Sequence, residues 1–503
     1  MIKTSINRHD LEYYLYAMVK AFFPEEQVLA PDTALHNIKE DASGEQNDRI
    51  DCLIKESSFS ISMTPGIILK KDASKTYDTH EGADSQAYKD EIRGDIYDFL
   101  SEYTGKQLRW GNLTGIRPTK LYLTKIMEMT SDKNVSENST EAEAVIKNME
   151  KLHRVSPLKG KLAMGIALRE RKIIESLNSK DSYSLYIGIP FCPSRCLYCS
   201  FTSNPISMFE GRVGTYIECI IKEIAAVKEI MKGKNPDTVY IGGGTPTALS
   251  ALELQLLLEK MSGIMSLDGL KEFTVEAGRP DSITKEKLMV LKEFPVNRIS
   301  VNPQTMNDKT LEIIGRKHTV RQFEEAFAVA RELGFDNINT DIILGLPGEK
   351  ESDIEHTIKR LTKMRPDSLT VHSLAIKRAS RLKELLEDMG DLRTLDFDRA
   401  MDIATGGADE MGLLPYYLYR QKDMGGNLEN TGFAREGKFG FYNVAIMEEV
   451  QTIIACGAGT VTKRVYGDGR IERCDTVKDV NLYISKIEEM IDRKRQLFMT
   501  TEC

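Results

Sequence analysis

Three of the chain's eight cysteines stand close together, as Cys192, Cys196 and Cys199. Their spacing, C-x3-C-x2-C, lets one loop bring three thiolates to a single inorganic cluster. Soft thiolates select iron–sulfur clusters or zinc. A structural zinc site takes four protein ligands, and the triplet has no histidine or fourth cysteine beside it. A redox dithiol needs only C-x-x-C and leaves Cys192 unexplained. The spacing therefore predicts a [4Fe–4S] cluster with three protein ligands, ahead of a zinc site.

Three thiolates leave one iron of such a cluster without a protein ligand. That iron can chelate the amino and carboxylate groups of S-adenosylmethionine. An electron from the cluster then cleaves the sulfonium bond and yields a 5′-deoxyadenosyl radical. In such a site the cofactor performs the difficult chemistry, while the protein supplies placement and excludes water. The cysteine spacing thus predicts radical chemistry without indicating the substrate.

A second motif, Gly242-Gly243-Gly244-Thr245-Pro246-Thr247, lies downstream of the cysteines. Consecutive glycines let the backbone approach a ligand closely and adopt positive φ angles. Thr245 is predicted to cap the following helix, with Pro246 at its first position. Backbone groups freed there can meet the methionine end of S-adenosylmethionine. A tight structural turn is the alternative, but three glycines at a strand end favour nucleotide binding.

From residue 184 onward, short apolar runs alternate with helical patterns. The expected strands are 184–189, 237–241, 273–277, 296–301, 338–344 and 368–374. This alternation predicts a parallel sheet. Eight such units close a full barrel, so six predict a partial barrel or an open doubly wound sheet. In both architectures ligands bind at the carboxyl ends of the strands. The cysteines, the glycine motif and the polar residues Glu276, Gln304 and Asp341 all fall at those ends.

The remaining sequence divides into two flanking regions. Residues 1–180 are predicted to form an N-terminal α+β extension, residues 181–380 the core, and residues 381–503 a smaller C-terminal domain on the substrate side. Within the extension, the polar stretches 72–86 and 131–143 are predicted as loops.

Composition excludes several classes of protein. The chain has 503 residues, of which 41% are hydrophobic and 29% charged, and this is globular composition. A net charge of −8 argues against a general nucleic-acid binder. The sequence contains no run of 18 apolar residues, so no membrane span is predicted. No signal-peptide pattern is present, so we expect a cytoplasmic protein whose thiols stay reduced.

The residues around the cysteines resemble a known family. Tyr186-x-x-Ile-Pro-Phe-Cys192, followed by Cys196-x-Tyr-Cys199-x-Phe, is similar to the radical S-adenosylmethionine (SAM) superfamily and, within it, to oxygen-independent coproporphyrinogen III oxidases. The N-terminal extension resembles that of the coproporphyrinogen dehydrogenase-like subgroup. The resemblance covers about residues 184–460 and implies a partial (β/α)6 TIM-like barrel of the radical SAM type. It also implies a [4Fe–4S] cluster held by the three cysteines, and one or two molecules of SAM.

The resemblance also implies which residues bind SAM. The positions matching the family's first SAM site are Tyr186, Gly243, Glu276 and Ala375. The positions matching its second SAM site are Tyr198, Gly244, Thr245, Gln304, Arg316 and Asp341.

The function implied by the resemblance is the oxidative decarboxylation of coproporphyrinogen III to protoporphyrinogen IX, with a tetrapyrrole substrate and an unidentified electron donor. The chain has Gly188 where the family's oxidases carry a histidine, and Phe201 where they carry a further cysteine. Phe201 is similar to the haem-chaperone branch, although residues 440–444 lack that branch's histidine. The alternatives are therefore a haem-binding chaperone or an anaerobic haem-modifying radical methyltransferase. The segment 416–422 either faces a tetrapyrrole or packs as a tyrosine-rich strand.

Overall fold

The computed structural model describes residues 1–24, 26–29, 48–55, 58–65, 69, 73–78, 85–115, 117–132, 134–177, 180–374, 395–420 and 428–499. The chain divides into two compact units. The N-terminal unit comprises Met1–Leu168 with Arg420–Leu428, and the barrel unit comprises Arg169–Tyr419 with Glu429–Cys503.

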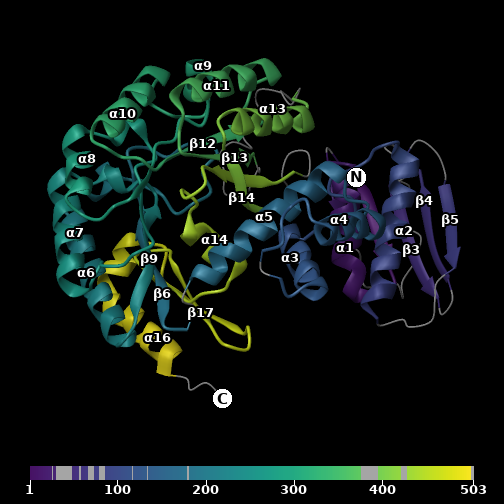
Figure 1. The fold of residues 1–503 in the computed structure, drawn as a ribbon, viewed down its shortest axis with the longest axis horizontal. Coiled ribbons are helices and arrows are strands. Elements are labelled where there is room, and N and C mark those ends of the chain that lie inside the picture. The colour runs from purple at the N-terminus through teal and green to yellow at the C-terminus, as the bar shows by residue number, and fades with distance from the viewer. Residues whose placement is uncertain are drawn as a thin grey trace, which may run out of the picture. The chain divides into compact units, whose positions relative to one another are not determined.

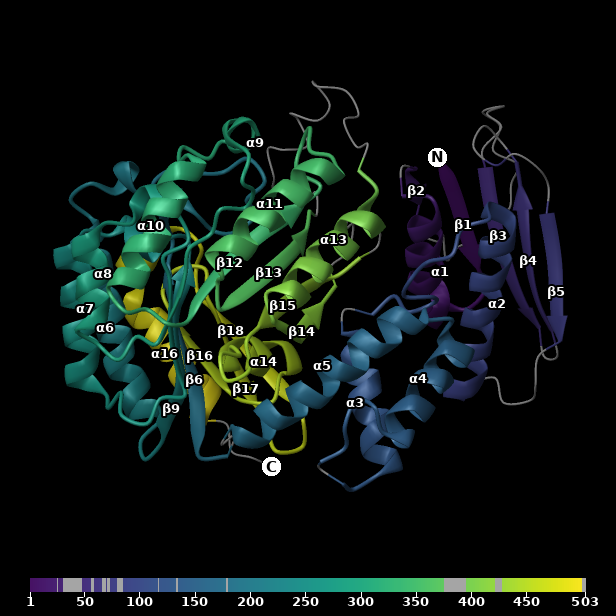
Figure 2. The same cartoon turned by 45° about the horizontal axis from the view of Figure 1, so that its top comes forward.

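The N-terminal unit is built on a five-stranded sheet in the order β2-β1-β3-β4-β5 (Figure 2). Its strands are β1 (Ile2–Ile6), β2 (Val28–Leu29), β3 (Asp48–Lys55), β4 (Ser58–Thr64) and β5 (Ala73–Asp78). Its helices are α1 (His9–Phe22), α2 (Gln86–Thr104), α3 (Pro118–Met129) and α4 (Thr140–His153), followed by α5 (Pro157–Ser176). Alternate residues of β4 are buried in one core with apolar residues of α1 and α2. This alternation is what a sheet with one covered face requires.

Two stretches predicted as loops contain regular structure. Strand β5 lies within 72–86 and pairs antiparallel with β4 at the edge of the sheet. An edge strand needs few apolar residues, because one side of it meets solvent. Helix α4 begins inside 131–143, where the Ser139 hydroxyl accepts a hydrogen bond from the backbone N–H of Ala142 at 3.1 Å. The polar residues there cap a helix, so both loop predictions were wrong in part.

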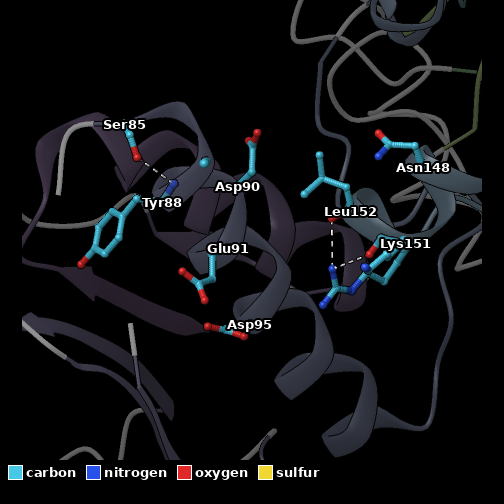
Figure 3. A pocket seen from close by; sticks show the side chains of 10 residues that line it. Ser85, Tyr88, Asp90, Glu91, Asp95, Asn148, Lys151 and Leu152 are labelled. Carbon is cyan, nitrogen blue, oxygen red and sulfur yellow. Dashed lines mark hydrogen bonds between the residues drawn. The ribbon is translucent and has the colours of Figure 1, made fainter. Parts of the chain in front are cut away.

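A cavity of about 690 Å³ lies in the N-terminal unit, between α2 and the end of α4 (Figure 3). Acidic residues of α2 line one wall, and burial raises the pKa of one of them, Asp95, to about 6. On the other wall Arg154 donates to the carbonyl oxygens of Lys151 and Leu152, both at 3.0 Å. Arg154 also pairs with Asp98 of α2 at 2.6 Å, so it ties the two walls together.

The barrel unit contains six parallel strands that are neighbours in chain order. They are β6 (Ser182–Ile189), β9 (Asn235–Gly243), β10 (Glu272–Glu276), β11 (Arg298–Ser300), β12 (Ile338–Leu344) and β13 (Ser368–Ser373). The connecting helices are α6 (Val213–Ile230), α7 (Ala251–Ile264), α8 (Lys285–Lys292), α9 (Asp308–Ile313), α10 (Val320–Glu332) and α11 (Glu351–Met364). Helices α6, α7, α8, α10 and α11 form an arc outside the strands (Figure 1). The predicted alternation and the α/β fold class are confirmed.

Further strands extend this sheet on both sides to eleven. Beyond β13 lie the antiparallel strands β15 (Asn430–Ala434) and β14 (Leu414–Tyr419). Beyond β6 lies β16 (Ile453–Cys456), which is parallel to β6, followed by the antiparallel strands β17 (Val461–Val465) and β18 (Ile471–Asp475). Tyr416 and Tyr417 are buried in β14, so this part of 416–422 is a packed strand, while residues 421 and 422 lie outside the described residues.

The other helices of the barrel unit are α13 (Phe397–Glu410), α14 (Phe441–Glu448), α15 (Val480–Ser485) and α16 (Ile487–Met499). A buried ion pair connects α16 to α6. The side chains of Lys494 and Glu223 are 1% and 0% exposed. Glu223 also accepts hydrogen bonds from the Tyr483 hydroxyl at 2.6 Å and the Gly457 backbone N–H at 2.8 Å. The buried Glu223 carboxylate therefore has several hydrogen-bonding partners, and losing one of them would leave part of its charge uncompensated.

Replacing Lys494 with alanine is expected to lower the free energy of unfolding of the barrel unit by about 3–5 kcal/mol, because the buried Glu223 carboxylate is then left unpaired. Urea unfolding followed by circular dichroism measures the change. Lys486→Ala is the matched control, since Lys486 pairs with Glu489 at an exposed site and such pairs contribute about 0–1 kcal/mol. Equal effects of the two substitutions would contradict the prediction.

Candidate functional site

The three cysteines lie on the loop that follows β6, and backbone contacts close this loop at its base. The short strands β7 (Phe191–Cys192) and β8 (Asn204–Pro205) pair in parallel. The Asn204 backbone N–H also donates to the Pro190 carbonyl at 2.8 Å. Cys192 is buried, whereas Cys196 and Cys199 are half-buried. The fold therefore presents three free thiols on one short loop at the carboxyl end of β6.

Each thiol has a polar neighbour within the barrel unit. The Thr245 hydroxyl lies 3.3 Å from the Sγ of Cys192, and the Ser203 hydroxyl lies 3.6 Å from the Sγ of Cys199. The third sulfur, on Cys196, accepts a hydrogen bond from the guanidinium of Arg279 at 3.3 Å. Polar groups thus stand beside all three sulfurs, whose thiolate forms are the ones that bind metal.

The donor set fits an iron–sulfur cluster. In the part of the chain that the structure describes, no three His, Cys, Asp or Glu side chains meet in the arrangement that a single metal ion requires. A cubane makes a different demand, because each thiolate binds a different iron and the three sulfurs need not converge on one ion. Burial raises the pKa of the Cys192 thiol to about 11, so a bound cation is needed to hold this sulfur as a thiolate.

The glycine motif is hydrogen-bonded to the start of the cysteine loop. The backbone N–H of Gly244 donates to the Ile189 carbonyl, and that of Thr245 donates to the Phe191 carbonyl, both at 2.7 Å. A Cβ added to Gly244 would lie 2.5 Å from the Phe191 carbonyl oxygen. Gly243 has a φ of +105°, a region that favours glycine. Glycine is therefore required at 244 by the close approach of the two loops, and at 243 by the positive φ.

The prediction that Thr245 caps the following helix holds for its position but not for its side chain. Thr245 is the N-cap residue of a single 3-10 turn, Pro246–Ala248, with Pro246 at the first position, but its side chain makes no capping hydrogen bond there. Helix α7 is capped instead by Ser250, which forms a reciprocal capping box with Glu253. The Thr245 hydroxyl is turned toward Cys192, so its position serves the cysteine loop rather than the helix.

A half-buried carboxyl stands next to the glycine motif. Glu276 ends β10 and accepts a hydrogen bond from the Tyr240 hydroxyl at 2.5 Å. A Cβ on Gly242 would lie 2.9 Å from this carboxyl. Burial raises the pKa of Glu276 to about 7. The rings of Tyr186, Tyr240 and Tyr442 stack against one another, with centroids 4.5–6.0 Å apart. The Glu276 carboxyl is thus hydrogen-bonded to one member of a cluster of three tyrosines.

Gln304 has an unusual backbone and a side chain with an unused acceptor. Its φ is +67°, which costs energy in a residue with a Cβ. Backbone hydrogen bonds to Asp341 at 3.0 Å and Ile343 at 2.9 Å hold it in this conformation. Its buried Oε1 has no hydrogen-bond partner among the described residues. Strain combined with an unsatisfied buried oxygen is typical of a binding residue.

Arg316 connects the cysteine loop to the middle of the barrel unit. Its guanidinium donates to the Tyr198 hydroxyl at 3.0 and 3.2 Å and to the Asn302 carbonyl at 2.9 Å. The Asn302 side chain in turn donates to Asp341 at 2.7 Å. Burial alone would raise the pKa of Asp341, but His372 and other hydrogen-bond donors lower it below its usual value. Asp341 is therefore ionised at neutral pH.

The structure brings the described predicted residues together at the carboxyl ends of β6, β9, β10, β11 and β12. Ala375 lies outside the described residues. Sequence reasoning missed Tyr240, Arg279 and Asn302. Two of these had a signal: Arg279 follows Glu276 on the same strand-end loop, and Asn302 follows β11 just before Gln304.

The two positions that differ from the family's oxidases have distinct surroundings. A Cβ added to Gly188 would lie 2.5 Å from the Cγ2 of Thr460, so Thr460 fills the space beside that strand. The Thr460 hydroxyl donates to the Gly457 carbonyl at 2.8 Å, which holds its side chain in place. Phe201, by contrast, is 70% exposed. A histidine therefore has no room at Gly188 unless Thr460 moves.

Comparison with known proteins gives consistent matches. The model of the radical SAM superfamily matches residues 186–361. The oxygen-independent coproporphyrinogen-III oxidase-like protein HemZ of Bacillus subtilis is 40% identical over 400 residues, which cover 78% of each chain. The heme chaperone HemW of Bacillus subtilis is 38% identical over 207 residues, 41% of this chain and 53% of that protein.

Among solved structures, coproporphyrinogen III oxidase (HemN) from Escherichia coli superposes with a TM-score of 0.50 at 19% identity, covering 63% of this chain and 72% of that chain. This likeness concerns the fold. Among the described residues, none of the helices combines the length and the apolar character that crossing a bilayer demands. The cysteine loop, the fold and the similarity to HemZ agree, and the chain belongs to the oxygen-independent coproporphyrinogen III oxidase-like family of the radical SAM superfamily, whose members use a [4Fe–4S] cluster and SAM.

Proposed function

We propose that the chain is a radical SAM enzyme that converts two propionates of coproporphyrinogen III into vinyl groups, giving protoporphyrinogen IX. The observation that carries the radical chemistry is the meeting of three free thiols, the glycine motif and the Glu276 carboxyl at one edge of the sheet. The substrate is supported by the 40% identity to a coproporphyrinogen oxidase-like protein.

The chain's own residues would bind and orient the reactants. When bound, the cluster and SAM supply the electron and the carbon radical that removes hydrogen from a propionate β-carbon. The backbone of the glycine motif, held close to the cysteine loop, would contact the methionine end of SAM, and Glu276 would accept hydrogen bonds from its ribose or amino group. The stacked tyrosines beside Glu276 would limit the access of water once SAM is bound. Each propionate loses one hydrogen, carbon dioxide and one electron, which passes to a one-electron acceptor.

A second SAM would occupy the hydrogen-bonded set around Arg316. Arg316 would pair with a carboxylate and Asp341 would accept from ribose hydroxyls. The unsatisfied Oε1 of Gln304 supports a ligand there, because a buried acceptor without a partner costs free energy. Tyr198, which already accepts from Arg316, and the neighbouring backbone of Gly244 and Thr245 would complete the site.

Haem binding without turnover is the second candidate. It is supported by the surroundings of Gly188, because Thr460 occupies the position that the oxidases' histidine would need. The exposed Phe201, in place of the oxidases' additional cysteine, agrees with the similarity to the heme chaperone HemW. On this alternative the chain would bind haem and transfer it to another protein.

One anaerobic reaction tests the proposal. Reconstituted protein is incubated with coproporphyrinogen III, SAM and a reductant, and products are separated by chromatography. We expect vinyl products together with 5′-deoxyadenosine. Stoichiometric haem binding and transfer with neither product would favour the chaperone. Haem consumption with methyl transfer would instead indicate a radical methyltransferase. Cys196→Ala protein is the control for radical-independent products.

The affinity for SAM is expected to fall as the pH is lowered through about 7. Burial, with Asp341 acting in the same direction, raises the pKa of Glu276 to about 7, against the Tyr240 hydrogen bond and Arg298. Below that pH the carboxyl is protonated and loses its charge. A hydrogen bond to a charged group contributes about 1.5–3 kcal/mol, roughly 10–150-fold in affinity. That range is the difference between the fully ionised and fully protonated forms; anaerobic calorimetry about one pH unit below and above this pKa should show about 5–10-fold of it, because each form is then only about 90% populated.

Glu276→Gln is the control for this pH dependence. Its amide keeps the shape of the carboxyl but does not titrate, so we expect weaker binding with little pH dependence. The same pH slope in the variant and the parent would show that another group is responsible.

A further inference from the structure

A buried arginine outside the predicted ligand sets stands beside the cysteine loop. Arg279 lies in the loop after β10 and is 3% exposed. Its Nη1 donates to the Sγ of Cys196 at 3.3 Å and to the carbonyl oxygen of Ser194 at 3.1 Å. A positive charge is thus held directly against one of the three sulfurs, within the same unit.

The remaining donors of this guanidinium are also engaged. Its Nε and Nη2 donate to the two carboxylate oxygens of Asp281 at 2.8 and 2.6 Å, and Nη2 reaches the Ser194 hydroxyl at 3.2 Å. A two-pronged carboxylate contact fixes the plane of the guanidinium. A guanidinium is not deprotonated in proteins, so Arg279 stays charged.

The backbone of Arg279 is held independently of the cysteines. Its carbonyl accepts a hydrogen bond from the Ser282 hydroxyl at 2.7 Å. The Ser282 hydroxyl lies 2.7 Å from that of Thr247, at the end of the glycine motif. Lys287 donates to the Thr247 carbonyl at 2.6 Å and to the Ser282 carbonyl at 3.0 Å. The folded core, and not the cluster, thus determines where the guanidinium stands.

We propose that Arg279 is a positioning residue for the cluster: its guanidinium holds the Cys196 thiolate in place, and its buried charge raises the midpoint potential of the cluster. Reduction adds a negative charge, which a cation and a hydrogen bond to sulfur stabilise more in the reduced state. Low exposure strengthens this interaction. The inference rests on the proposed cluster and goes beyond the SAM-binding residues.

Two substitutions separate the charge of Arg279 from its shape. Arg279→Gln keeps an amide donor but removes the charge, and Arg279→Lys keeps the charge but loses the contact with both Asp281 oxygens. For the Gln variant we expect at least a tenfold shift of the equilibrium toward oxidised cluster, about 59 mV for one electron. For the Lys variant we expect a shift in the same direction of less than half that size. Anaerobic redox titration followed by electron paramagnetic resonance measures both.

Arg360→Gln is the matched control, since it removes the same charge from helix α11, where Arg360 pairs with Glu324. Its midpoint potential should equal that of the parent. An unchanged potential in both Arg279 variants would overturn the inference and leave the cluster itself standing. If the Gln variant takes up no iron, the Lys variant decides: a shifted potential supports the inference and an unchanged one overturns it. A parent protein that takes up no cluster would overturn the proposed function, and this inference with it.

Discussion

Alanine at any one of Cys192, Cys196 and Cys199 is expected to give folded protein that retains no stable [4Fe–4S] cluster and forms no 5′-deoxyadenosine. Each thiolate would hold its own iron, so a variant with two thiolates would leave two irons without a protein ligand. Substituting residues that only contact a metal ligand costs about 10–100-fold in metal affinity, and losing a ligand should cost more than 100-fold. Iron and sulfide content after anaerobic reconstitution, with the absorbance of thiolate-to-iron charge transfer, measures the loss.

Cys474→Ala is the control for these variants, because Cys474 is a half-buried free thiol in β18, outside the cysteine loop. It should take up as much iron as the parent. Thermal unfolding by circular dichroism separates loss of the cluster from loss of the fold. Normal iron content in all three alanine variants would contradict the cluster, and with it the proposed radical chemistry.

The six parallel strands of the barrel unit were predictable because each is buried on both faces. Such strands are short apolar runs, and β12, for example, begins and ends at the predicted residues, 338 and 344. The outer strands lack this signal. Strand β18 contains Glu472, Arg473 and Asp475, and its residues are exposed or half-exposed. A strand of this kind is specified by its pairing with β17, a tertiary contact that local pattern does not reveal.

The candidate site was predictable where its residues lie at strand ends. The cysteines, the glycine motif and Glu276 could be placed on one edge of the sheet because parallel strands bring their carboxyl ends together. Side-chain direction was not predictable in the same way. Thr245 has the sequence position of a helix cap, yet its hydroxyl lies 3.3 Å from the Sγ of Cys192. That choice depends on the close approach of two loops, which only the folded structure specifies.

The surroundings of Gly188 were also not predictable, because they depend on a residue far away in the sequence. The sequence reveals that a histidine of the family's oxidases is replaced, but not what takes its place. In the structure, β16 pairs with β6 and brings the loop containing Thr460 against Gly188. The C-terminal strands therefore determine what β6 presents next to the cysteine loop.

Replacing Gly244 with alanine is expected to weaken SAM binding by about 5–150-fold, the equivalent of the 1–3 kcal/mol that overpacking costs. The new methyl group would lie 2.5 Å from the Phe191 carbonyl oxygen and 2.9 Å from that of Ile189. To relieve these contacts the glycine motif must move away from the cysteine loop, which breaks the hydrogen bonds that join them. Anaerobic calorimetry with SAM measures the affinity, and iron content shows whether the cluster remains.

Gly406→Ala makes the same chemical change where the fold has room for it. Gly406 lies within α13, and a Cβ there would meet nothing within 4 Å. In a helix interior alanine is favoured over glycine by about 1 kcal/mol, so this variant should be slightly more stable and bind SAM as the parent does. If Gly244→Ala bound SAM with the parent's affinity, the glycine motif could move away from the cysteine loop without affecting SAM binding. Glycine at that position would then reflect an ordinary turn, without a role in binding the nucleotide.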